Sequence, residues 1–155
     1  MKIKNSTWVL LIVLLAIGGW FYQRYYVAPS INFSDIKVYD LYGNAILLNN
    51  DKPTVISFYE TWCPPCQQEI QWMNEAYLTM QNEFNFIVVS SEKVEKLAPV
   101  AKAYQLPIYQ LANSRKDFGV YSIPTVFIFD TDGKLVFNHV GLIDFRDKEN
   151  ITKHL

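Results

Sequence analysis

The sequence predicts an α/β domain with a mixed central sheet flanked by helices, preceded by one transmembrane helix. Three observations lead to this fold class. Of the 155 residues, 50% are hydrophobic and 19% are charged, a composition typical of a folded chain. Beyond the N-terminal region, apolar β-branched runs alternate with segments of helical periodicity, as in sheets covered by helices on both faces. An uncharged apolar run, Trp8–Tyr22, lies near the N-terminus and favours membrane insertion.

Length and charge limit the organisation and the function of the chain. Without the apolar N-terminus about 125 residues remain, which is one domain able to bury a core without disulfides. We expect residues 1–27 to form a signal-anchor helix, residues 28–33 a linker and residues 34–155 the folded domain. Lys and Arg total 14 against 15 for Asp and Glu, so there is no net basic field for nucleic acid, and we expect no such partner.

The N-terminal run predicts a single-pass anchor in the cell membrane. Lys2 and Lys4 precede it against the lone Arg24 after it, so the positive-inside rule places the catalytic domain outside the cytoplasm. A cleaved signal peptide is the alternative. Its small-residue cleavage motif would be Ala16–Gly18, which lies inside the apolar run, and this favours a retained anchor. Either way the domain is exported, to a compartment where disulfides persist.

The first elements of the domain are a hairpin and a buried strand. Ile36–Tyr39 and Ala45–Leu48 are short apolar runs on either side of Leu41–Asn44, whose Gly and Asn are typical of a hairpin turn. Thr54–Tyr59 is β-branched and aromatic throughout. This segment therefore predicts a central strand that is buried on both faces.

An amphipathic helix is expected next, followed by a second buried strand at Phe86–Val89. Pro64 and Pro65 suit the first helical positions, because proline has no N–H to leave unpaired there. Apolar residues then recur at three- and four-residue steps, namely Ile70, Met73, Tyr77, Met80 and Phe84.

The last part of the chain predicts, in order, a helix, a short strand, a short helix or turn, a hairpin and a final helix. We expect a helix at Glu92–Tyr104 that is disturbed at Pro99, a short strand at Leu106–Leu111 and a short helix or turn at Arg115–Tyr121. Thr125–Phe129 and Leu135–Val140 predict a second hairpin, because Asp130–Gly133 between them is turn-forming. A last helix is expected from Asp144 to the end.

The most informative motif is Trp62-Cys63-Pro64-Pro65-Cys66, between a predicted strand and a predicted helix. Cys63 and Cys66 are the only cysteines, and the loop they close is too short to stabilise the fold appreciably. A cysteine at a helix start meets the positive end of the helix dipole, which favours the thiolate and makes Cys63 nucleophilic. Cys66 follows one turn later, near enough to form a disulfide or to attack a mixed one, and we expect it to be the more shielded thiol.

Other interpretations of the two cysteines are less favoured. They could be inert core residues, but paired spacing, helix-start prolines and strand context would then coincide by chance. Zinc needs four ligands, and beyond the cysteines the chain offers only His139 and His154, so we expect no metal site and no cofactor. Carriage of Cu(I) by the two thiolates needs fewer ligands and stays open.

With these motifs the chain resembles the thioredoxin superfamily, and within it the membrane-tethered TlpA/ResA-type thiol–disulfide oxidoreductases. The resemblance covers roughly residues 33–155. It rests on Phe58–Cys66, on Gly119–Thr125 before a strand, on Asp132-Gly133-Lys134, and on Gly141 after the last strand. The insertion between Val94 and Leu111 resembles the extra helix and strand of that subgroup.

The resemblance implies roles for particular residues. Pro124 is implied to be a cis-proline lying against the cysteine pair, with the Ile123 backbone free to pair with an extended substrate. Trp62 would offer a flat apolar contact beside the nucleophile. The set implied for substrate binding is Trp62, Pro64, Pro65, Ile123 and Thr125.

Three positions depart from, or add to, the family pattern. Ser57 stands where thioredoxins carry a buried Asp, and a hydroxyl cannot be the same proton acceptor. Glu60 stands where relatives have a small residue, and Glu92 resembles the acidic residue that ResA-type proteins place near their cysteines. Either carboxylate could take the proton of Cys66, and we assign this role to Glu92. The expected catalytic set is therefore Cys63, Cys66, Pro124 and Glu92.

The expected function is extracytoplasmic thiol–disulfide exchange in the reducing direction. Pro64 and Pro65 remove two N–H donors that would otherwise solvate the Cys63 thiolate, and a strongly oxidising protein needs that thiolate greatly stabilised. The resemblance implies a monomer acting on protein thiols and disulfides such as those of apocytochrome c, with a DsbD/CcdA-like membrane protein as electron donor. A disulfide-forming oxidase and a Cu(I)-carrying module are the alternatives.

Overall fold

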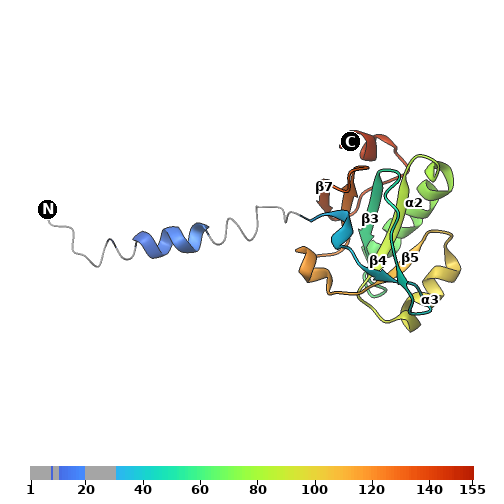
Figure 1. The fold of residues 1–155 in the computed structure, drawn as a ribbon, viewed down its shortest axis with the longest axis horizontal. Helices are drawn as coiled ribbons and strands as arrows, with labels where there is room; N and C mark the ends of the chain where they lie inside the picture. The colour runs from blue at the N-terminus through green and yellow to red at the C-terminus, as the bar shows by residue number, and fades with distance from the viewer. Residues whose placement is uncertain (1–7, 9–10, 20–30) are drawn as a thin grey trace.

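The structure is a computed structural model that describes residue 8, residues 11–19 and residues 31–155 (Figure 1). The folded domain holds a seven-stranded sheet and its covering helices. Its elements in chain order are η1 (Phe33–Asp35), β1 (Val38–Tyr39), β2 (Ala45–Ile46), β3 (Thr54–Phe58), α2 (Pro64–Met80), β4 (Asn85–Ser90), α3 (Val94–Ala103), β5 (Ile108–Leu111), η2 (Arg115–Phe118), β6 (Thr125–Phe129), β7 (Leu135–Val140) and α4 (Glu149–Thr152).

The sheet is mixed, as the sequence predicts. Its strand order is β2-β1-β5-β4-β3-β6-β7, with β3, β4 and β5 parallel and with β6 antiparallel to β3. Both predicted hairpins are present, β1 with β2 and β6 with β7. Every residue of β3 and of β6 is buried, because the sheet is covered on both faces at its centre.

Alternate residues of the central strands enter two separate cores. Val55 and Val126 face one side, where they join the buried face of α2 and the C-terminal residues Phe145 and Ile151. The opposite side carries Ile56, Phe58, Phe127, Phe129 and residues from η1, β1 and η2. Phe58 and Phe127 meet edge to face with ring centroids 4.9 Å apart. The period-2 alternation of strand side chains thus accounts for the two layers of core.

Residues on the N-terminal side of the predicted domain boundary at residue 34 also pack on the domain. Ile31 and Phe33 are buried, and the Phe33 N–H donates to the carbonyl of Gly133 at 2.9 Å. Gly133 has a φ of 77°, and a Cβ added there would lie 3.3 Å from the Cβ of Phe33. The turn of the second hairpin therefore needs glycine, both for its backbone conformation and for the close approach of Phe33.

Helix boundaries differ from the sequence expectations in two places. The expected helix from Asp144 to the end of the chain is wrong, since α4 covers only Glu149–Thr152. The Asp144 carboxylate accepts hydrogen bonds from the backbone and the side chain of Arg146, and the Asp147 carboxylate accepts from the Glu149 N–H. Such local bonds compete with helix formation and delay its start.

The second difference concerns α3, which begins at Val94 rather than at Glu92 and continues through Pro99. The carboxylate of Glu92 is bonded to the loop before the cysteine motif, so this residue stays outside the helix. Pro99 removes one backbone donor without ending the helical segment.

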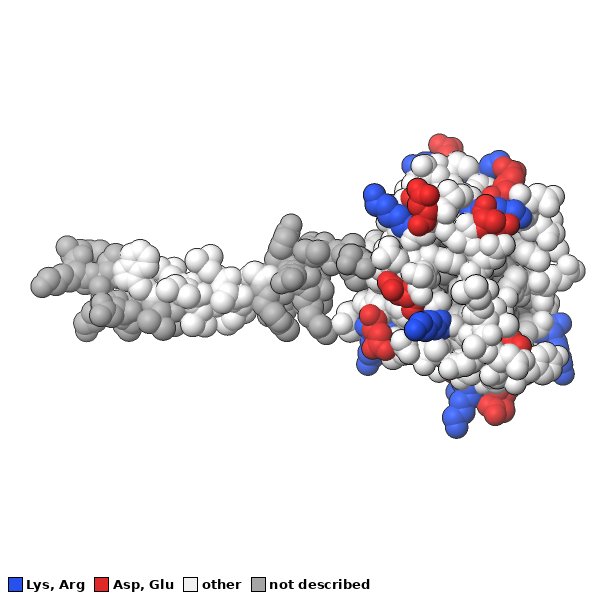
Figure 2. Space-filling view, in the orientation of Figure 1, with Lys and Arg blue, Asp and Glu red and all other residues white. Residues whose placement is uncertain are grey.

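The predicted anchor, residues 1–27, falls largely outside the described residues, as do residues 28–30 of the predicted linker. Helical structure is described at residue 8 and over residues 11–19. Within the described part of the chain, no helix combines the length and the apolar character needed to cross a membrane. On the face of the domain shown in Figure 2, basic and acidic side chains are interspersed.

Candidate active site

The cysteine motif lies at the start of α2, and the two sulfurs form a disulfide. Cys63 is the N-cap residue, and its Sγ accepts a hydrogen bond of 3.2 Å from the Cys66 N–H. The S–S distance is 2.08 Å and the Cα atoms are 5.2 Å apart. Pro64 and Pro65 occupy the first two helical positions, so within this turn the Cys66 N–H is the donor that can stabilise a Cys63 thiolate.

Both cysteines are almost fully covered in this oxidised state. Cys63 is 3% exposed and Cys66 is 1% exposed, so the expected difference in accessibility is small while the disulfide is closed. Pro64 and Pro65 are exposed, and Trp62 is 63% exposed, which rules out a core position for its ring. The indole and the two prolines therefore lie on the surface next to the covered disulfide in the chain.

The Ile123–Pro124 peptide bond is cis, as the family resemblance implied. Strand pairing places it beside the motif, because Thr125 lies opposite Phe58 and Pro124 precedes it at the edge where β3 ends. The segment is held on both sides, since the Thr125 hydroxyl donates to the Ser122 carbonyl at 2.7 Å and the Pro124 carbonyl accepts from the Gly141 N–H at 2.9 Å. The structure thus brings Ile123, Pro124 and Thr125 to the same sheet edge as the cysteines.

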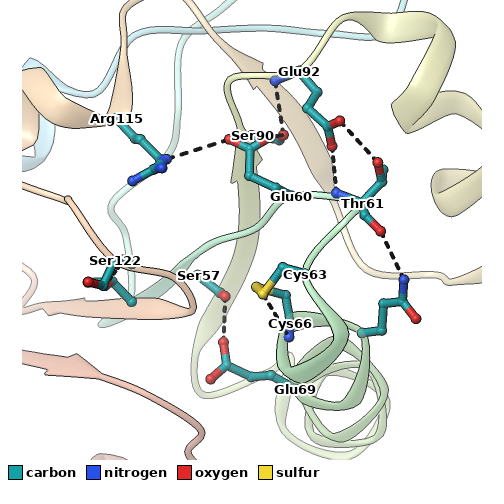
Figure 3. Close-up of a disulfide and its surroundings, with 12 residues drawn as sticks. Ser57, Glu60, Thr61, Cys63, Cys66, Glu69, Ser90, Glu92, Arg115 and Ser122 are labelled. Atoms are coloured by element: carbon teal, nitrogen blue, oxygen red, sulfur yellow. Dashed lines mark hydrogen bonds and ion pairs between the residues drawn. A yellow bond between two sulfur atoms is a disulfide. The ribbon is translucent and has the colours of Figure 1, made fainter.

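Glu69 is a buried carboxyl group that the sequence expectations missed. It lies one turn after Cys66 on the buried face of α2 and is fully covered. Its Oε1 accepts a 2.6 Å hydrogen bond from the Ser57 hydroxyl (Figure 3). Its Oε2 accepts from the Ile143 N–H at 3.3 Å. Burial raises the pKa of Glu69 to about 7, against the opposing effect of these two bonds.

The position of Glu69 explains the departure noted at Ser57. The buried acid is on the helix rather than on the strand, and the strand residue is its hydrogen-bond donor. A signal was present in the sequence, because Glu69 is three residues after Cys66 and next to Ile70, on the face that the apolar periodicity buries. A carboxyl group on the apolar face of a helix is costly and therefore indicates a functional candidate.

Glu92 lies at the edge of the site and contacts the loop before the cysteines. Its carboxylate accepts from the Thr61 N–H at 2.5 Å, from the Thr61 hydroxyl at 3.0 Å and from the Lys96 ammonium at 2.8 Å. Burial raises the pKa of Glu92, but the bonds from Lys96 and Thr61 outweigh it and hold the pKa below its ordinary value. A carboxylate stabilised in this way is a weak proton acceptor, so the catalytic role expected for Glu92 stays a prediction with little geometric support.

Glu60 is buried at the end of β3, with its carboxylate turned away from the sulfurs in Figure 3. It accepts from the Ser90 hydroxyl at 3.0 Å and from the Ser91 N–H at 3.3 Å, and it lies 3.8 Å from Nε of Arg115. Burial raises its pKa, whereas these neighbours lower it.

The two histidines weighed as metal ligands both contact Phe137 on β7. The ring of His154 stacks on it at 3.5 Å between centroids, and the ring of His139 is stacked at 6.1 Å. Across the described residues, no three or more His, Cys, Asp or Glu side chains are grouped so that they could hold a metal ion.

The fold and this site define the class of the protein as a thioredoxin-like thiol–disulfide oxidoreductase. Its Cys63–Cys66 disulfide caps a helix at the sheet edge that also carries the cis-proline. The chain belongs to the AhpC/TSA family, whose model matches residues 28–138.

Curated relatives named as thiol-disulfide oxidoreductases or thioredoxin-like proteins match nearly the whole chain. The thiol-disulfide oxidoreductase ResA of Geobacillus thermodenitrificans is 29% identical, over 99% of this chain and 94% of that protein. The thioredoxin-like protein YneN of Bacillus subtilis is 28% identical, over 91% and 92% respectively.

Solved structures support the fold. A thioredoxin-family thiol:disulfide interchange protein from Chlorobium tepidum superposes with a TM-score of 0.65 at 22% identity, covering 82% of this chain and 97% of that one. An exposed lipoprotein thioredoxin of Streptococcus pneumoniae gives a TM-score of 0.65 at 21% identity, with coverage of 77% and 98%.

Proposed function

We propose that this oxidoreductase is a membrane-anchored reductase that opens disulfides in proteins outside the cytoplasm. The observation that carries the direction is the first turn of α2, where Pro64 and Pro65 leave the Cys66 N–H as the local donor to the Cys63 sulfur. A sparsely solvated thiolate is only moderately stabilised, and a dithiol that is not strongly stabilised gives up its electrons readily.

The reaction begins from the reduced pair. The Cys63 thiolate attacks one sulfur of a substrate disulfide, forms a mixed disulfide and releases the other substrate sulfur as a thiolate. The Cys66 thiol then loses its proton and attacks Sγ of Cys63. This step breaks the mixed disulfide, releases the second substrate thiolate and leaves the Cys63–Cys66 disulfide; the substrate gains two electrons and the enzyme loses two.

Glu69 is the best-placed group to take the proton of Cys66. It lies one helical turn away on the same buried face, it accepts hydrogen bonds from the neutral Ser57 hydroxyl and Ile143 N–H, and its pKa of about 7 lets it hold or release a proton near neutral pH. Ser57 orients one carboxylate oxygen by its 2.6 Å hydrogen bond. Ser57 therefore contributes to the proton-accepting site without being the acceptor.

The substrates we propose are extended segments of envelope proteins, with apocytochrome c as the case that the family resemblance favours. A DsbD/CcdA-like membrane dithiol would reduce the Cys63–Cys66 disulfide again by the reverse exchange. The lysines before the apolar N-terminal run support an anchor whose domain faces outward.

Two measurements test this proposal. Equilibration of the domain with glutathione buffers should give a potential near that of reducing thioredoxins, and a value near the strongly oxidising DsbA would overturn the reductase direction. Cys66→Ser should accumulate mixed disulfides through Cys63, whereas Cys63→Ser should trap none. Trapping through Cys66 instead would reverse the assignment of the nucleophile.

A further inference from the structure

Two segments distant in sequence flank the cysteine pair and are connected by an ion pair between a buried carboxylate and a partly buried guanidinium. The first is the loop of residues 59–62, which joins β3 to the motif, and the second is the segment of residues 119–124, which joins η2 to the cis-proline. Glu60 belongs to the first segment, and Arg115 starts the 3-10 helix that leads into the second. Their side chains meet at 3.8 Å between Arg115 Nε and Glu60 Oε1.

Glu60 is held rigidly on the motif side. Its side chain is 5% exposed, and both carboxylate oxygens accept hydrogen bonds from the end of β4, through the Ser90 hydroxyl and the Ser91 N–H. Its own carbonyl accepts from the Cys63 N–H at 3.1 Å. The backbone of Glu60 is therefore fixed relative to the cysteine loop, and this bond does not depend on the side chain of residue 60.

Arg115 is held equally firmly on the cis-proline side. Its side chain is 17% exposed, and its Nη1 donates a 2.8 Å hydrogen bond to the carbonyl of Val120. Its backbone N–H donates to the Ser91 hydroxyl at 3.2 Å. One guanidinium thus spans from Glu60 to the chain that precedes Ile123, as Figure 3 shows for its contact with the Glu60 carboxylate.

A buried ion pair contributes little net stability, because the desolvation of both charges offsets their attraction. The loss of either partner would leave the other charge with its hydrogen bonds to Ser90 and Ser91 or to Val120, but without the opposite charge. The pair is therefore suited to fixing the separation of two chain segments rather than to strengthening the fold.

We propose that Glu60 and Arg115 are positioning residues that set the spacing between the Cys63 loop and the Ile123–Pro124 segment. This inference rests on the reductase function proposed above. An extended polypeptide substrate must contact both segments at once, its sulfur at Cys63 and its backbone at Ile123. A small organic disulfide needs only Cys63. The pair thus favours polypeptide disulfides over small ones.

Steady-state reduction of two substrates tests this role, one a disulfide within an extended peptide and the other hydroxyethyl disulfide. The variants are Glu60→Gln, which removes the charge and keeps one of the two acceptor oxygens, Arg115→Lys, which keeps the charge but not the span to Val120, and the double variant. We expect KM for the peptide to rise about threefold to tenfold in each. kcat and the rate with hydroxyethyl disulfide should stay within about twofold of the parent.

Coupling between the two side chains gives a second readout. If they act as one unit, the double variant should show no larger rise in KM than the more affected single variant. Lys148→Met is the matched control, because it removes an exposed ion pair with Glu83 that involves neither segment. It should leave KM and kcat unchanged for both substrates.

The outcomes separate this inference from the proposed function. Equal losses with both disulfides, an unchanged KM for the peptide, or multiplicative effects in the double variant would overturn the positioning role while leaving the enzyme a reductase. If the unsubstituted protein reduced neither disulfide, the proposed function itself would fail. If Glu60→Gln does not fold, Arg115→Lys alone decides the question: a raised KM for the peptide supports the positioning role, and an unchanged KM overturns it.

Discussion

Glu69 and Glu92 are the same residue type close to the same cysteine motif, yet their surroundings shift their pKa values in opposite directions. Glu69 is buried on α2 with two neutral donors, and its pKa is raised to about 7. Glu92 lies beside the Lys96 ammonium and accepts two hydrogen bonds from Thr61, which lower its pKa. A carboxyl group that is buried without a neighbouring cation has a raised pKa and can accept a proton near neutral pH. A carboxylate beside a cation and several hydrogen-bond donors has a lowered pKa and stays ionised.

The largest expected effect comes from removing the buried carboxylate. In Glu69→Gln the release of the mixed disulfide should slow by about a hundredfold, because general-base assistance of this size is typical. Glu92→Gln should slow it far less. Rapid-quench measurement of the resolving step after mixing with a peptide disulfide gives both rates, and an equal or larger effect of Glu92→Gln would restore Glu92 as the proton acceptor.

The stability of the oxidised protein should show the raised pKa directly. Glu69 binds its proton more tightly in the folded chain than in the unfolded one, so its stabilising contribution is complete below pH 4.5 and is lost as the pH rises through about 7. The free energy of unfolding of the parent should therefore fall by roughly 3 kcal/mol relative to that of Glu69→Gln between these limits. Urea unfolding at pH 4.5 and pH 8 measures it, and parallel profiles for the two proteins would contradict the assignment.

The contribution of Glu92 to the free energy of unfolding should have the opposite pH dependence and a smaller magnitude. Its pKa is lowered by folding, so its contribution is present above the pKa of the unfolded chain and is lost as the pH falls. Glu92→Gln should cost about 1 kcal/mol at pH 7, because one charge-assisted anchor of the Thr61 loop is weakened. The same urea series checks this value; a variant as stable as the parent at pH 7 would show that the contact is dispensable.

The smallest effect is expected for the cation next to Glu92. Lys96 is 63% exposed, so its ion pair with Glu92 is screened by solvent. Lys96→Met should leave the melting temperature close to that of the parent. Thermal unfolding at low and high salt measures this, and a large loss only at low salt would show that Lys96 contributes more to the position of Glu92 than its exposure suggests.

The main elements of the fold could be predicted from local patterns. Residues 125–140 predict the β6–β7 hairpin with its observed bounds, because strand-forming runs flank a turn of Asp, Thr and Gly. The start of α2 at Pro64 followed from the prolines and the apolar periodicity. Local patterns failed at Asp144, where side-chain bonds to the next residues delay the last helix to Glu149.

The sequence by itself determined the reactive pair, since Cys63 and Cys66 are adjacent on one helical turn wherever that helix lies. Only the tertiary structure decided the pKa shifts of the carboxyl groups near them. Glu60, Glu69 and Glu92 are indistinguishable as residue types, and their pKa shifts arise from burial and from partners such as Arg115, Ser57 and Lys96. Chemistry that depends on neighbouring atoms along the chain can be predicted from sequence, but solvation depends on contacts made by distant segments and requires the folded chain.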